Sequence, residues 1–455
     1  MFRRVLIANR GEVAVRIVRA CHELGVEAVA AYSSADRDSL HVRLADRAVH
    51  VGPPPAAQSY LNIPSLVAAA TTTGCDAVHP GWGFLAENAE FAAACEDNNL
   101  AFVGPRPETI EVMGDKIRAK ETVAAAGLPL VPGSDGAATL DEARALGRDV
   151  GYPLLLKASA GGGGRGMRLV AEPAQLEAAY RTAAAEALAA FSEGSLYVER
   201  AVMGARHVEI QVLGDGEGAV LTLGERDCSI QRRHQKLVEE GPSPAVSDEL
   251  RAAMEDAARR ATEALRYRGA GTIEFLLDEG GGFYFIEMNT RLQVEHPVTE
   301  LVTGIDLAHA QLRIAAGEGL PRTGRAGLNG HAIEFRINAE DPVHDFRPAP
   351  GTVTRFRPPL GPGVRVDTHV VDGYVIPPFY DSLVAKVIVW AEDRPAALGR
   401  ARRALTEFEL DGVPTTRDLA IDILESEPFT TGRYTTAFLT EAGAALPALA
   451  VVEAS

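Results

Sequence analysis

Cysteines and long hydrophobic runs are scarce in this sequence. The four cysteines are Cys21, Cys75, Cys95 and Cys228. They form no C-x-x-C pair, so we expect neither a disulfide framework nor a zinc site. No run of about 18 apolar residues is present, which argues against a membrane-spanning helix and a secretory signal peptide. These absences favour a protein of the reducing cytoplasm with no membrane partner.

Positive charge is also in short supply. Lysine and arginine number 45 against 62 aspartates and glutamates, which gives a formal net charge of −17. Such a charge repels the phosphates of nucleic acids unless basic residues gather in a patch. The basic cluster ERDCSIQRRHQK at 225–236 also carries acidic residues and has no aromatic side chain. We therefore expect no nucleic-acid partner and interpret the cluster as a phosphate-handling strand and loop, with an exposed charged loop as the alternative.

Glycine and proline are frequent without dominating the composition. The chain has 44 glycines and 27 prolines. Their combined share exceeds the average of roughly 12% but lies below the roughly 25% at which disorder is expected. Collagen-like, mucin-like and disordered proteins are therefore excluded. At roughly 150 residues per domain, the 455 residues predict about three globular domains.

The first hundred residues alternate strand-like and helix-like segments. Apolar strands are expected at 5–8, 26–33, 76–80 and 100–104. Apolar residues at helical spacing follow the first strand, and residues 87–99 also predict a helix. This βαβ rhythm predicts a doubly wound parallel sheet, and so an α/β domain, over residues 1–115.

A smaller α+β unit is expected at about 131–203, after a helix at 114–127. Its predicted elements are strands at 153–159, 167–170 and 195–200 and a long alanine-rich helix at 173–191. We interpret this unit as a lid. Together with a mixed core that follows, it makes a second domain over residues 116–320.

The rest of the chain is predicted as that core and a β-rich third part. The core elements are strands within 206–225, a helix at 248–267, a hairpin at 271–289 and a helix at 297–316. Residues 321–330, PRTGRAGLNG, predict a linker. Beyond it, strands are expected at 333–341, 351–356, 364–370 and 385–391, with one terminal helix at about 395–410. These form a third domain over 331–440, and 441–455 are expected to be a frayed, disordered or partner-facing tail.

The glycine-rich segment KASAGGGGRGM at 157–167 lies between two predicted strands. Glycines let the backbone close over an anion and present N–H groups to phosphate oxygens, and Lys157 and Arg165 add positive charge. The segment therefore predicts a phosphate-binding loop. A flexible loop without a ligand remains the alternative.

The hairpin TIEFLLDEGGGFYFIEMN suggests a cation site. A two-residue turn at Gly280-Gly281 would place Glu274 opposite Glu287, with apolar neighbours on the other face. Opposed like charges destabilise a sheet, so we expect a cation between them. With the amide oxygen of Asn289, they are hard ligands suited to magnesium. A solvated hairpin face or a slipped register is the alternative.

The segment NTRLQVEHP follows directly. Asn289, Arg291, Gln293 and Glu295 alternate, so an extended chain would place them on one face. Arginine binds small carboxylates with its bidentate fork, and a neighbouring glutamate can act as a base. This face therefore predicts a pocket for a planar anion.

Several strings together resemble biotin carboxylase, a family of the ATP-grasp superfamily. They are IANRGE, HPGWGF, MGDK, KASAGGGGRGM, RHVEIQV, ERDCSIQRRHQK, FIEMNTRLQVEHPVTE and EFRINAED. The resemblance covers residues 3–440. It implies a carbon–nitrogen ligase that uses ATP and bicarbonate to carboxylate biotin on a carrier protein, through carboxyphosphate. Biotin is then a substrate and group carrier.

The resemblance also implies roles for individual residues. The implied nucleotide and phosphate contacts are Lys116, Lys157, Gly163, Gly164, His207, Gln231 and His234, with Glu199, Arg200, Ala201 and Val202 at the adenine. The implied metal ligands, for magnesium or manganese, are Glu274, Glu287 and Asn289. The implied bicarbonate pocket is Lys236, Arg291, Gln293 and the backbone of Val294. Glu295 matches the base, and Arg336 matches the cation that stabilises the enolate-like form of biotin.

The chain departs from the usual family pattern at a few positions. Trp82 stands where tyrosine is usual, Ala160 where glycine is usual, Arg200 where lysine is common and Pro362 where an aromatic is common. These changes bear on the nucleotide site, the lid and the subunit contact.

Partner proteins are implied as well. Positions matching Arg19, Glu23 and Arg365 imply a homodimer. No Met-Lys-Met biotin attachment motif is present, so we expect a separate biotin carrier and a carboxyltransferase. We expect the whole enzyme to be an acyl-CoA carboxylase such as acetyl-CoA carboxylase, which serves fatty acid biosynthesis. The alternatives are another ATP-grasp carboxylate–amine ligase and a non-catalytic nucleotide-binding subunit.

Overall fold

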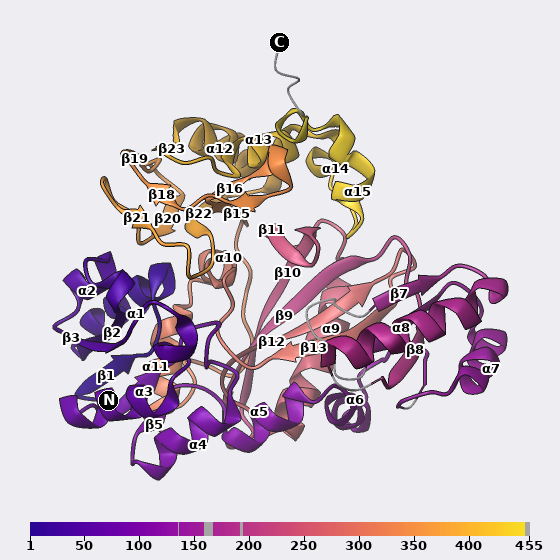
Figure 1. The fold of residues 1–455 in the computed structure, drawn as a ribbon, viewed down its shortest axis with the longest axis horizontal. Coiled ribbons are helices and arrows are strands. Elements are labelled where there is room, and N and C mark those ends of the chain that lie inside the picture. Colours follow the sequence, from indigo (N-terminus) through magenta and orange to yellow (C-terminus); the bar gives the residue numbers. More distant parts are fainter. Residues whose placement is uncertain (135, 159–166, 192–193, 451–455) are drawn as a thin grey trace.

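The structure is a computed structural model that describes residues 1–134, 136–158, 167–191 and 194–450. Figure 1 shows the N-terminal part at lower left, a small part with α7 and α8 at the right, a central sheet, and the C-terminal part above it. The predicted mixed α/β and α+β architecture is confirmed. Gly163, Gly164 and Ala160 lie outside the described residues.

The N-terminal part is built on a parallel sheet with strand order β3-β2-β1-β4-β5, as predicted. Its strands are β1 (Arg4–Ile7), β2 (Glu27–Ser33), β3 (Arg47–Gly52), β4 (Ala77–His79) and β5 (Ala101–Phe102). Its helices are α1 (Gly11–Glu23), α2 (Leu40–Leu44), α3 (Ile63–Thr73), α4 (Ala89–Asp97) and α5 (Pro107–Gly114). The inner strands are largely apolar and buried, as expected for a parallel sheet with helices on both faces. The edge strand β3 was not predicted, since its exposed residues carry little apolar pattern.

The unit predicted as a lid is a separate antiparallel sheet with strand order β7-β6-β8. Its strands are β6 (Leu154–Ala158), β7 (Met167–Val170) and β8 (Leu196–Arg200), and α7 (Leu140–Val150) and α8 (Leu176–Phe191) pack with them. The helix α6 (Lys116–Ala125) precedes the lid, as predicted. The helix α7 was not predicted. It begins with a capping box in which Thr139 and Glu142 bond reciprocally.

One long sheet runs through the core and the C-terminal part, in the order β13-β12-β9-β10-β11-β15-β22-β20. Its strands are β9 (Arg206–Asp215), β10 (Val220–Arg232), β11 (Gln235–Gly241), β12 (Arg268–Leu277), β13 (Phe283–Asn289), β15 (His331–Asn338), β20 (Val364–Thr368) and β22 (Leu383–Ala391). The helix α9 (Asp248–Ala264) packs on this sheet. Within the predicted linker, β14 (Gly324–Arg325) pairs with β10. The long sheet also contains strands from both sides of that linker, such as β12 before it and β15 after it.

The turn between β12 and β13 differs from the prediction. Leu277 pairs with Phe283, and the Asp278 N–H donates to Gly282 O at 2.8 Å. The loop is thus longer than two residues, and the predicted two-residue turn at 280–281 is wrong. Gly281 takes φ = 83° in it, which glycine adopts without strain.

A bulge in β13 compensates for this longer loop. Phe275 pairs with Phe285, while Glu274 pairs with Glu287, so Ile286 is an extra residue in β13. The loop shifts the register by one residue, and the bulge shifts it back. The predicted pairing of Glu274 with Glu287 is confirmed for this reason.

The predicted helix at 297–316 is two helices. They are α10 (His296–Thr303) and α11 (Leu307–Ala315). Gly304 ends α10 in the left-handed conformation at φ = 69°, and Asp306 caps α11 by accepting from the His309 N–H at 2.7 Å. The two helices keep one apolar periodicity, which is why the break was missed.

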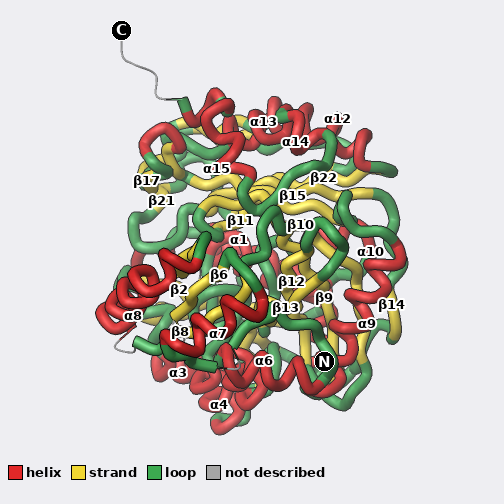
Figure 2. Tube along the Cα trace, turned by 90° about the vertical axis from the view of Figure 1, so that its right-hand side faces the viewer, coloured by secondary structure: helices red, strands yellow, loops and turns green. Residues whose placement is uncertain are grey.

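The C-terminal part has more helices than the predicted one. These are α12 (Arg394–Glu407), α13 (Arg417–Glu425), α14 (Glu427–Thr430) and α15 (Phe438–Ala442). Figures 1 and 2 show α12 and α13 over β15 and β22, where they bury a core that includes Phe335 and Leu405. Leu446 of the predicted tail packs into the same core. Residues 451–455 of that tail lie outside the described part.

Short strands complete this part of the chain. They are β16 (Glu340–Asp341), β17 (Arg347–Pro348), β18 (Gly351–Thr352), β19 (Arg355–Arg357), β21 (Val375–Ile376) and β23 (Glu409–Asp411). Within the described ranges, every helix is too short or too polar to span a lipid bilayer. All four cysteines are described, and they are buried and free of disulfide bonds.

Leu405→Ala tests the packing of α12 on the long sheet. Leu405 is 0% exposed in the C-terminal core, whereas Leu360 is 75% exposed. We expect Leu405→Ala to lower the free energy of unfolding in urea by about 2–5 kcal/mol. The matched variant Leu360→Ala is expected to change it by less than about 0.5 kcal/mol. Equal effects of the two substitutions would contradict this account of the core.

Candidate functional site

Lys236, near the start of β11, lies among buried carboxylates. Its ammonium donates hydrogen bonds to Glu209 Oε2 at 2.6 Å, Glu274 Oε1 at 3.0 Å and Glu295 Oε1 at 2.6 Å. Burial lowers the pKa of a lysine, but the Cys228 thiol and these carboxylates raise the pKa of Lys236 well above its ordinary value. The side chain therefore stays charged at neutral pH and offsets the negative charge around it.

Glu295 lies fully buried at the N-terminal end of α10. Its Oε1 accepts from Lys236, and its Oε2 accepts from Arg336 Nη2 at 2.8 Å. Burial would raise the pKa of Glu295, but Lys236, Arg336 and the buried Arg226 hold it well below its usual range. The helix N-terminus also favours negative charge here. Glu295 is therefore an ionised carboxylate between cations from two neighbouring strands.

Arg291 forms hydrogen bonds that hold together the segment that follows β13. Its Nε donates to Glu87 Oε2 at 2.7 Å, its Nη2 to Asn289 Oδ1 at 2.9 Å and its Nη1 to Gln293 Oε1 at 3.0 Å. The strand ends at Asn289, so the expected alternation on one extended face does not hold beyond it. The guanidinium, rather than strand geometry, brings the predicted amides together and near Glu295.

Glu274 and Glu287 pair across the hairpin. Glu274 Oε1 accepts from Asn289 Nδ2 at 2.8 Å, and Glu274 Oε2 lies 3.1 Å from His207 Nε2. Burial would raise the pKa of Glu274, but Lys236 and His207 hold it well below its usual range. Partial desolvation and the charge of Glu274 raise the pKa of Glu287. Negative charge therefore accumulates on this face of the hairpin.

This donor set fits a magnesium or manganese ion. The carboxylates of Glu274 and Glu287 are in register, and Asn289 follows two residues on along β13. Carboxylate and amide oxygens are the hard ligands that such ions prefer. The Asn289 oxygen accepts one hydrogen bond from Arg291 and keeps a second lone pair for a cation. A bound divalent cation would also offset the repulsion between the paired carboxylates.

Glu199 binds one predicted nucleotide-site cation, Lys157, and one lysine that was not predicted, Lys120. Lys157 Nζ donates to Glu199 Oε2 at 2.5 Å, and Lys120 donates to Glu199 Oε1. Lys120 Nζ also lies 4.3 Å from the centroid of the Tyr197 ring. Burial lowers the pKa of Lys116, which lines a cavity of about 420 Å³ with Lys120 and Tyr197. This cavity lies where α6 meets the lid.

The other predicted nucleotide residues lie at two places. Arg200 ends β8, with Ala201 and Val202 directly after it, and Arg200 Nη2 donates to Tyr284 Oη at 3.1 Å. Gln231 lies near the end of β10 and His234 in the turn that follows, and both line a cavity of about 460 Å³. Burial lowers the pKa of His234. The lid and the β10–β11 turn therefore carry separate parts of the predicted set.

The structure joins most of the predicted anion and metal residues into one connected network. Its members are His207, Lys236, Glu274, Asn289, Arg291, Gln293, Glu295 and Arg336. The carbonyl of Val294, within the same loop, accepts a hydrogen bond from Lys386. Lys157, which was predicted to bind the nucleotide, lies outside this network and pairs with Glu199 of β8.

Sequence reasoning missed several residues that hold the network in place. Arg226 is fully buried and donates to Glu209 Oε1 at 2.6 Å, and Glu239 accepts from Arg336 Nε at 2.6 Å. One signal was available for Glu209. It alternates with His207 and Gln211 on a strand that is otherwise apolar, which indicates a polar buried face. No comparable signal marks Glu239.

Glu239 and Glu334 are two fully buried carboxyl groups that pair across β11 and β15. Among the residues that the structure describes, neither oxygen of Glu334 has a hydrogen-bond partner. Burial and the nearby Glu295 raise the pKa of Glu239 to about 7, against the pull of Arg336. Burial and Glu239 also raise the pKa of Glu334 well above its ordinary value, against the pull of Lys386. The pair therefore holds a proton at neutral pH.

Comparison with known families matches each part of this architecture. The N-terminal domain of biotin carboxylase matches residues 1–110, and its C-terminal domain matches residues 334–441. The ATP-binding domain of the carbamoyl-phosphate synthase L chain matches residues 115–323. The biotin carboxylase of Nostoc is 55% identical over 442 residues, which cover 97% of this chain and 99% of that protein.

The chain belongs to the biotin carboxylase family. It is accordingly an ATP-dependent ligase that carboxylates biotin. A pyruvate carboxylase subunit of Methanothermobacter thermautotrophicus is 48% identical, with 97% of this chain and 90% of that protein covered.

A solved biotin carboxylase structure agrees over the whole chain. The biotin carboxylase domain dimer of the Hydrogenobacter thermophilus 2-oxoglutarate carboxylase has a TM-score of 0.92 and 47% identity, with 100% of each chain covered. That structure contains MgADP, ADP and bicarbonate.

Glu334→Gln tests the protonated carboxyl pair. The folded pKa values are raised, so the folded chain keeps a proton that the unfolded chain releases above its ordinary pKa. The wild-type free energy of unfolding should therefore fall as pH rises from about 5 to about 8. Replacing the Glu334 carboxyl group with a neutral amide should remove much of this fall in the free energy of unfolding. We expect equal stability at pH 5 and a variant more stable by about 2 kcal/mol at pH 8, measured by urea unfolding.

The exposed Glu392 provides the control, because Glu392→Gln should follow the wild type at both pH values. A Glu334→Gln variant that is less stable than the wild type at pH 8 would show that Glu334 is ionised in the folded chain.

Proposed function

We propose that the chain performs the first half-reaction of a biotin-dependent acyl-CoA carboxylase. In this reaction, bicarbonate activated by ATP as carboxyphosphate carboxylates biotin on a carrier protein. The observation that carries the proposal is the position of Glu295. Its buried carboxylate lies between Lys236 and Arg336, which are cations suited to two different anionic partners.

Bicarbonate would bind beside Glu295. Lys236, the Arg291 fork, the Gln293 amide and the backbone N–H of Val294 supply donors for its oxygens. The close contacts among Arg291, Gln293 and Asn289 support this, because they hold the donors together before an anion enters. Preorganised donors avoid the cost of ordering them at the moment of reaction.

Glu295 would act as the base that takes the proton of bicarbonate. In the structure, Lys236 and Arg336 keep the pKa of Glu295 low, which makes it a weak base. Bound anions that attract Lys236 and Arg336 would weaken the interaction of these two cations with Glu295. The pKa of Glu295 would then rise. The base would therefore become effective when its substrates are in place. Arg336 would then stabilise the enolate-like form of biotin.

The nucleotide would lie between the lid and the core. Its phosphate contacts would be Lys116, Lys157, Gly163, Gly164, His207, Gln231 and His234, and its adenine would meet Glu199, Arg200, Ala201 and Val202. The cavity at Lys116 and the lysine pair on Glu199 support this placement. Glu274, Glu287 and Asn289 would hold magnesium or manganese, which neutralises charge as the γ-phosphoryl group transfers.

The final acceptor of the carboxyl group would be set by a partner transferase. We propose an acyl-CoA acceptor. A 2-oxo acid is the second candidate, because relatives of high identity include a 2-oxoglutarate carboxylase domain and a pyruvate carboxylase subunit. Supplying the purified chain with carrier and transferase proteins of each type, and measuring which acceptor becomes carboxylated, separates the two.

We also propose the domain division 1–115, 116–320 and 331–440 and a homodimer. The matched family segments support the division. Arg19 and Glu23 are exposed one turn apart on α1, where a second subunit would reach them. Glu23 also lies 2.9 Å from His309 Nε2, and the Arg365 guanidinium pairs with Glu300 and Asp367, all within the same chain. Sedimentation velocity of the wild type and Arg19→Glu would test the dimer.

The proposed half-reaction is tested by phosphate release from MgATP. We expect release that requires bicarbonate and rises with free biotin, together with formation of carboxybiotin. Release indifferent to bicarbonate and biotin would favour another ATP-grasp ligase. No release even with a biotinylated carrier would favour a non-catalytic subunit.

Glu295→Gln is expected to keep nucleotide binding and lose most turnover. The amide cannot accept the proton of bicarbonate, and loss of a general base typically costs about 10²–10⁴-fold in rate. Bicarbonate-dependent phosphate release measures turnover, and calorimetric titration with MgADP measures nucleotide affinity. Unchanged turnover would remove Glu295 from the role of base.

A further inference from the structure

Lys386, on β22, is a fully buried cation that the proposed function does not use. Its Nζ donates to Val294 O at 2.8 Å and lies 3.1 Å from Glu12 Oε2. The lysine, the carbonyl and the carboxylate come from the C-terminal part, the loop before α10 and the N-terminal helix α1. A buried ammonium is costly unless it is paired and hydrogen bonded, so these contacts hold three distant segments in one arrangement.

The carbonyl that Lys386 binds belongs to the peptide group between Val294 and Glu295. This group is planar, so a hydrogen bond to its oxygen fixes its orientation and the position of the Glu295 Cα. Lys236 and Arg336 hold the carboxylate of the same residue. Lys386 thus constrains the main chain of Glu295, while the other two cations constrain its side chain.

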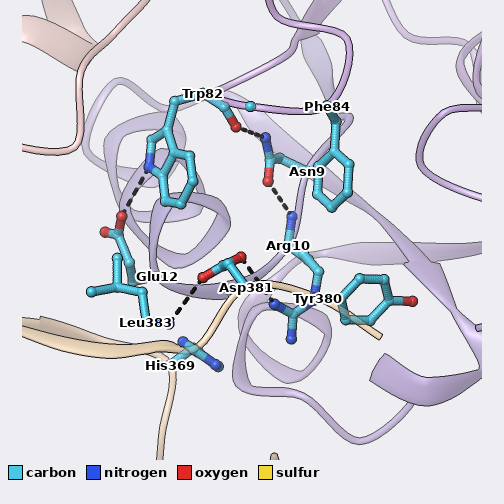
Figure 3. A pocket seen from close by; sticks show the side chains of 11 residues that line it. Asn9, Arg10, Glu12, Trp82, Phe84, His369, Tyr380, Asp381 and Leu383 are labelled. Atoms are coloured by element: carbon cyan, nitrogen blue, oxygen red, sulfur yellow. Dashed lines mark hydrogen bonds and ion pairs between the residues drawn. The ribbon is translucent and has the colours of Figure 1, made fainter. Parts of the chain in front are cut away.

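Glu12 connects this lysine to Trp82. The Trp82 Nε1–H donates to Glu12 Oε1 at 3.0 Å, while Glu12 Oε2 faces Lys386. Figure 3 shows the indole pointing at the Glu12 carboxylate along the wall of a cavity of about 220 Å³. The Asn9 amide donates to Trp82 O at 2.7 Å and fixes the backbone of the tryptophan. One carboxylate oxygen of Glu12 therefore accepts a hydrogen bond from Trp82, and the other forms an ion pair with Lys386 without hydrogen-bond geometry.

We propose that Lys386 is a positioning residue, held by Glu12 and Trp82, that sets the backbone of the loop carrying the base Glu295. This inference rests on the proposed role of Glu295. The tryptophan, which stands where the family usually has tyrosine, supplies the indole N–H for this chain of contacts. This series of contacts runs from Trp82 through Glu12 and Lys386 to the Val294 carbonyl. None of these residues needs to touch bicarbonate.

The charges around Lys386 keep it cationic. Asp367 Oδ2 of β20 lies 3.6 Å from Nζ. Burial lowers the pKa of Lys386, but Glu12 and Asp367 raise it, with Arg365 opposing them. A cation at this point also limits the repulsion among the carboxyl groups that converge here. Its charge and its single carbonyl contact are both properties that substitution can remove.

The test compares variants of the residues in this series of contacts with a matched control. Lys386→Met removes the ammonium and keeps an unbranched chain, Glu12→Gln keeps the acceptor for Trp82 without the charge, and Trp82→Phe keeps an aromatic wall without the N–H. Arg394→Met is the control. It breaks the ion pair between the half-buried Arg394 and the buried Glu240, whose atoms lie 2.7 Å apart. Glu240 lies beside Glu239 on β11, so its side chain faces the opposite side of the sheet.

Bicarbonate-dependent ATP cleavage is measured without biotin, so that biotin binding does not enter the result. We expect Lys386→Met to lose about 100-fold in kcat/KM for bicarbonate, and Glu12→Gln and Trp82→Phe about 5- to 10-fold, each with an unchanged KM for ATP. Trp82→Phe should have no further effect in the Lys386→Met chain, because both act through one contact. Arg394→Met should lower the thermal midpoint and leave both KM values unchanged.

Three outcomes would overturn the inference. They are unchanged bicarbonate kinetics in Lys386→Met, equal losses in Arg394→Met, or a loss that affects ATP and bicarbonate alike. If Lys386→Met does not fold, Glu12→Gln and Trp82→Phe decide, and wild-type bicarbonate kinetics in both would overturn it. A wild-type chain without bicarbonate-dependent cleavage would instead contradict the proposed function.

Discussion

The arrangement of the site depends on the cost of burying carboxylates. Glu209, Glu274 and Glu295 converge in a region that excludes water, where an uncompensated charge is strongly destabilising. Lys236 donates hydrogen bonds to all three. Arg226 donates to Glu209, and Arg336 donates to Glu295. Each cation is held in turn by more than one partner. The charges therefore fix each other's positions, which gives the site its geometry before any ligand is bound.

The long sheet explains how residues from distant segments meet. Lys236 of β11, Arg336 of β15 and Lys386 of β22 lie on successive neighbouring strands. All three contact the short stretch Val294–Glu295 at the start of α10. A displacement of any of these strands would change the position of Glu295. The unit predicted as a lid forms a sheet of its own, so its Lys157 on β6 lies outside these contacts.

Strands and helices with strong apolar patterns could be predicted from the sequence, because burial follows periodicity directly. The edge strand β3 could not be predicted, because its residues have little apolar pattern. The break at Gly304 could not be predicted either, because the apolar periodicity continues across it. The pairing of Glu274 with Glu287 was right although the turn was wrong, because the bulge at Ile286 cancels the longer loop. The network itself was beyond prediction. Contacts such as Arg291 with Glu87 join residues about 200 positions apart, and local spacing carries no record of them.

The same ion pairs explain how anionic substrates can enter so acidic a protein. Lys157 pairs with Glu199, and Lys236 and Arg336 pair with Glu295, so every one of these cations already has an anion beside it. Binding a phosphate or bicarbonate then exchanges one anion for another and does not desolvate a bare charge, which limits the cost of binding. The displaced carboxylate is left with fewer donors, and its pKa rises. In the proposed reaction this change would have no chemical use at Glu199, whereas at Glu295 it would create the base that takes the proton of bicarbonate.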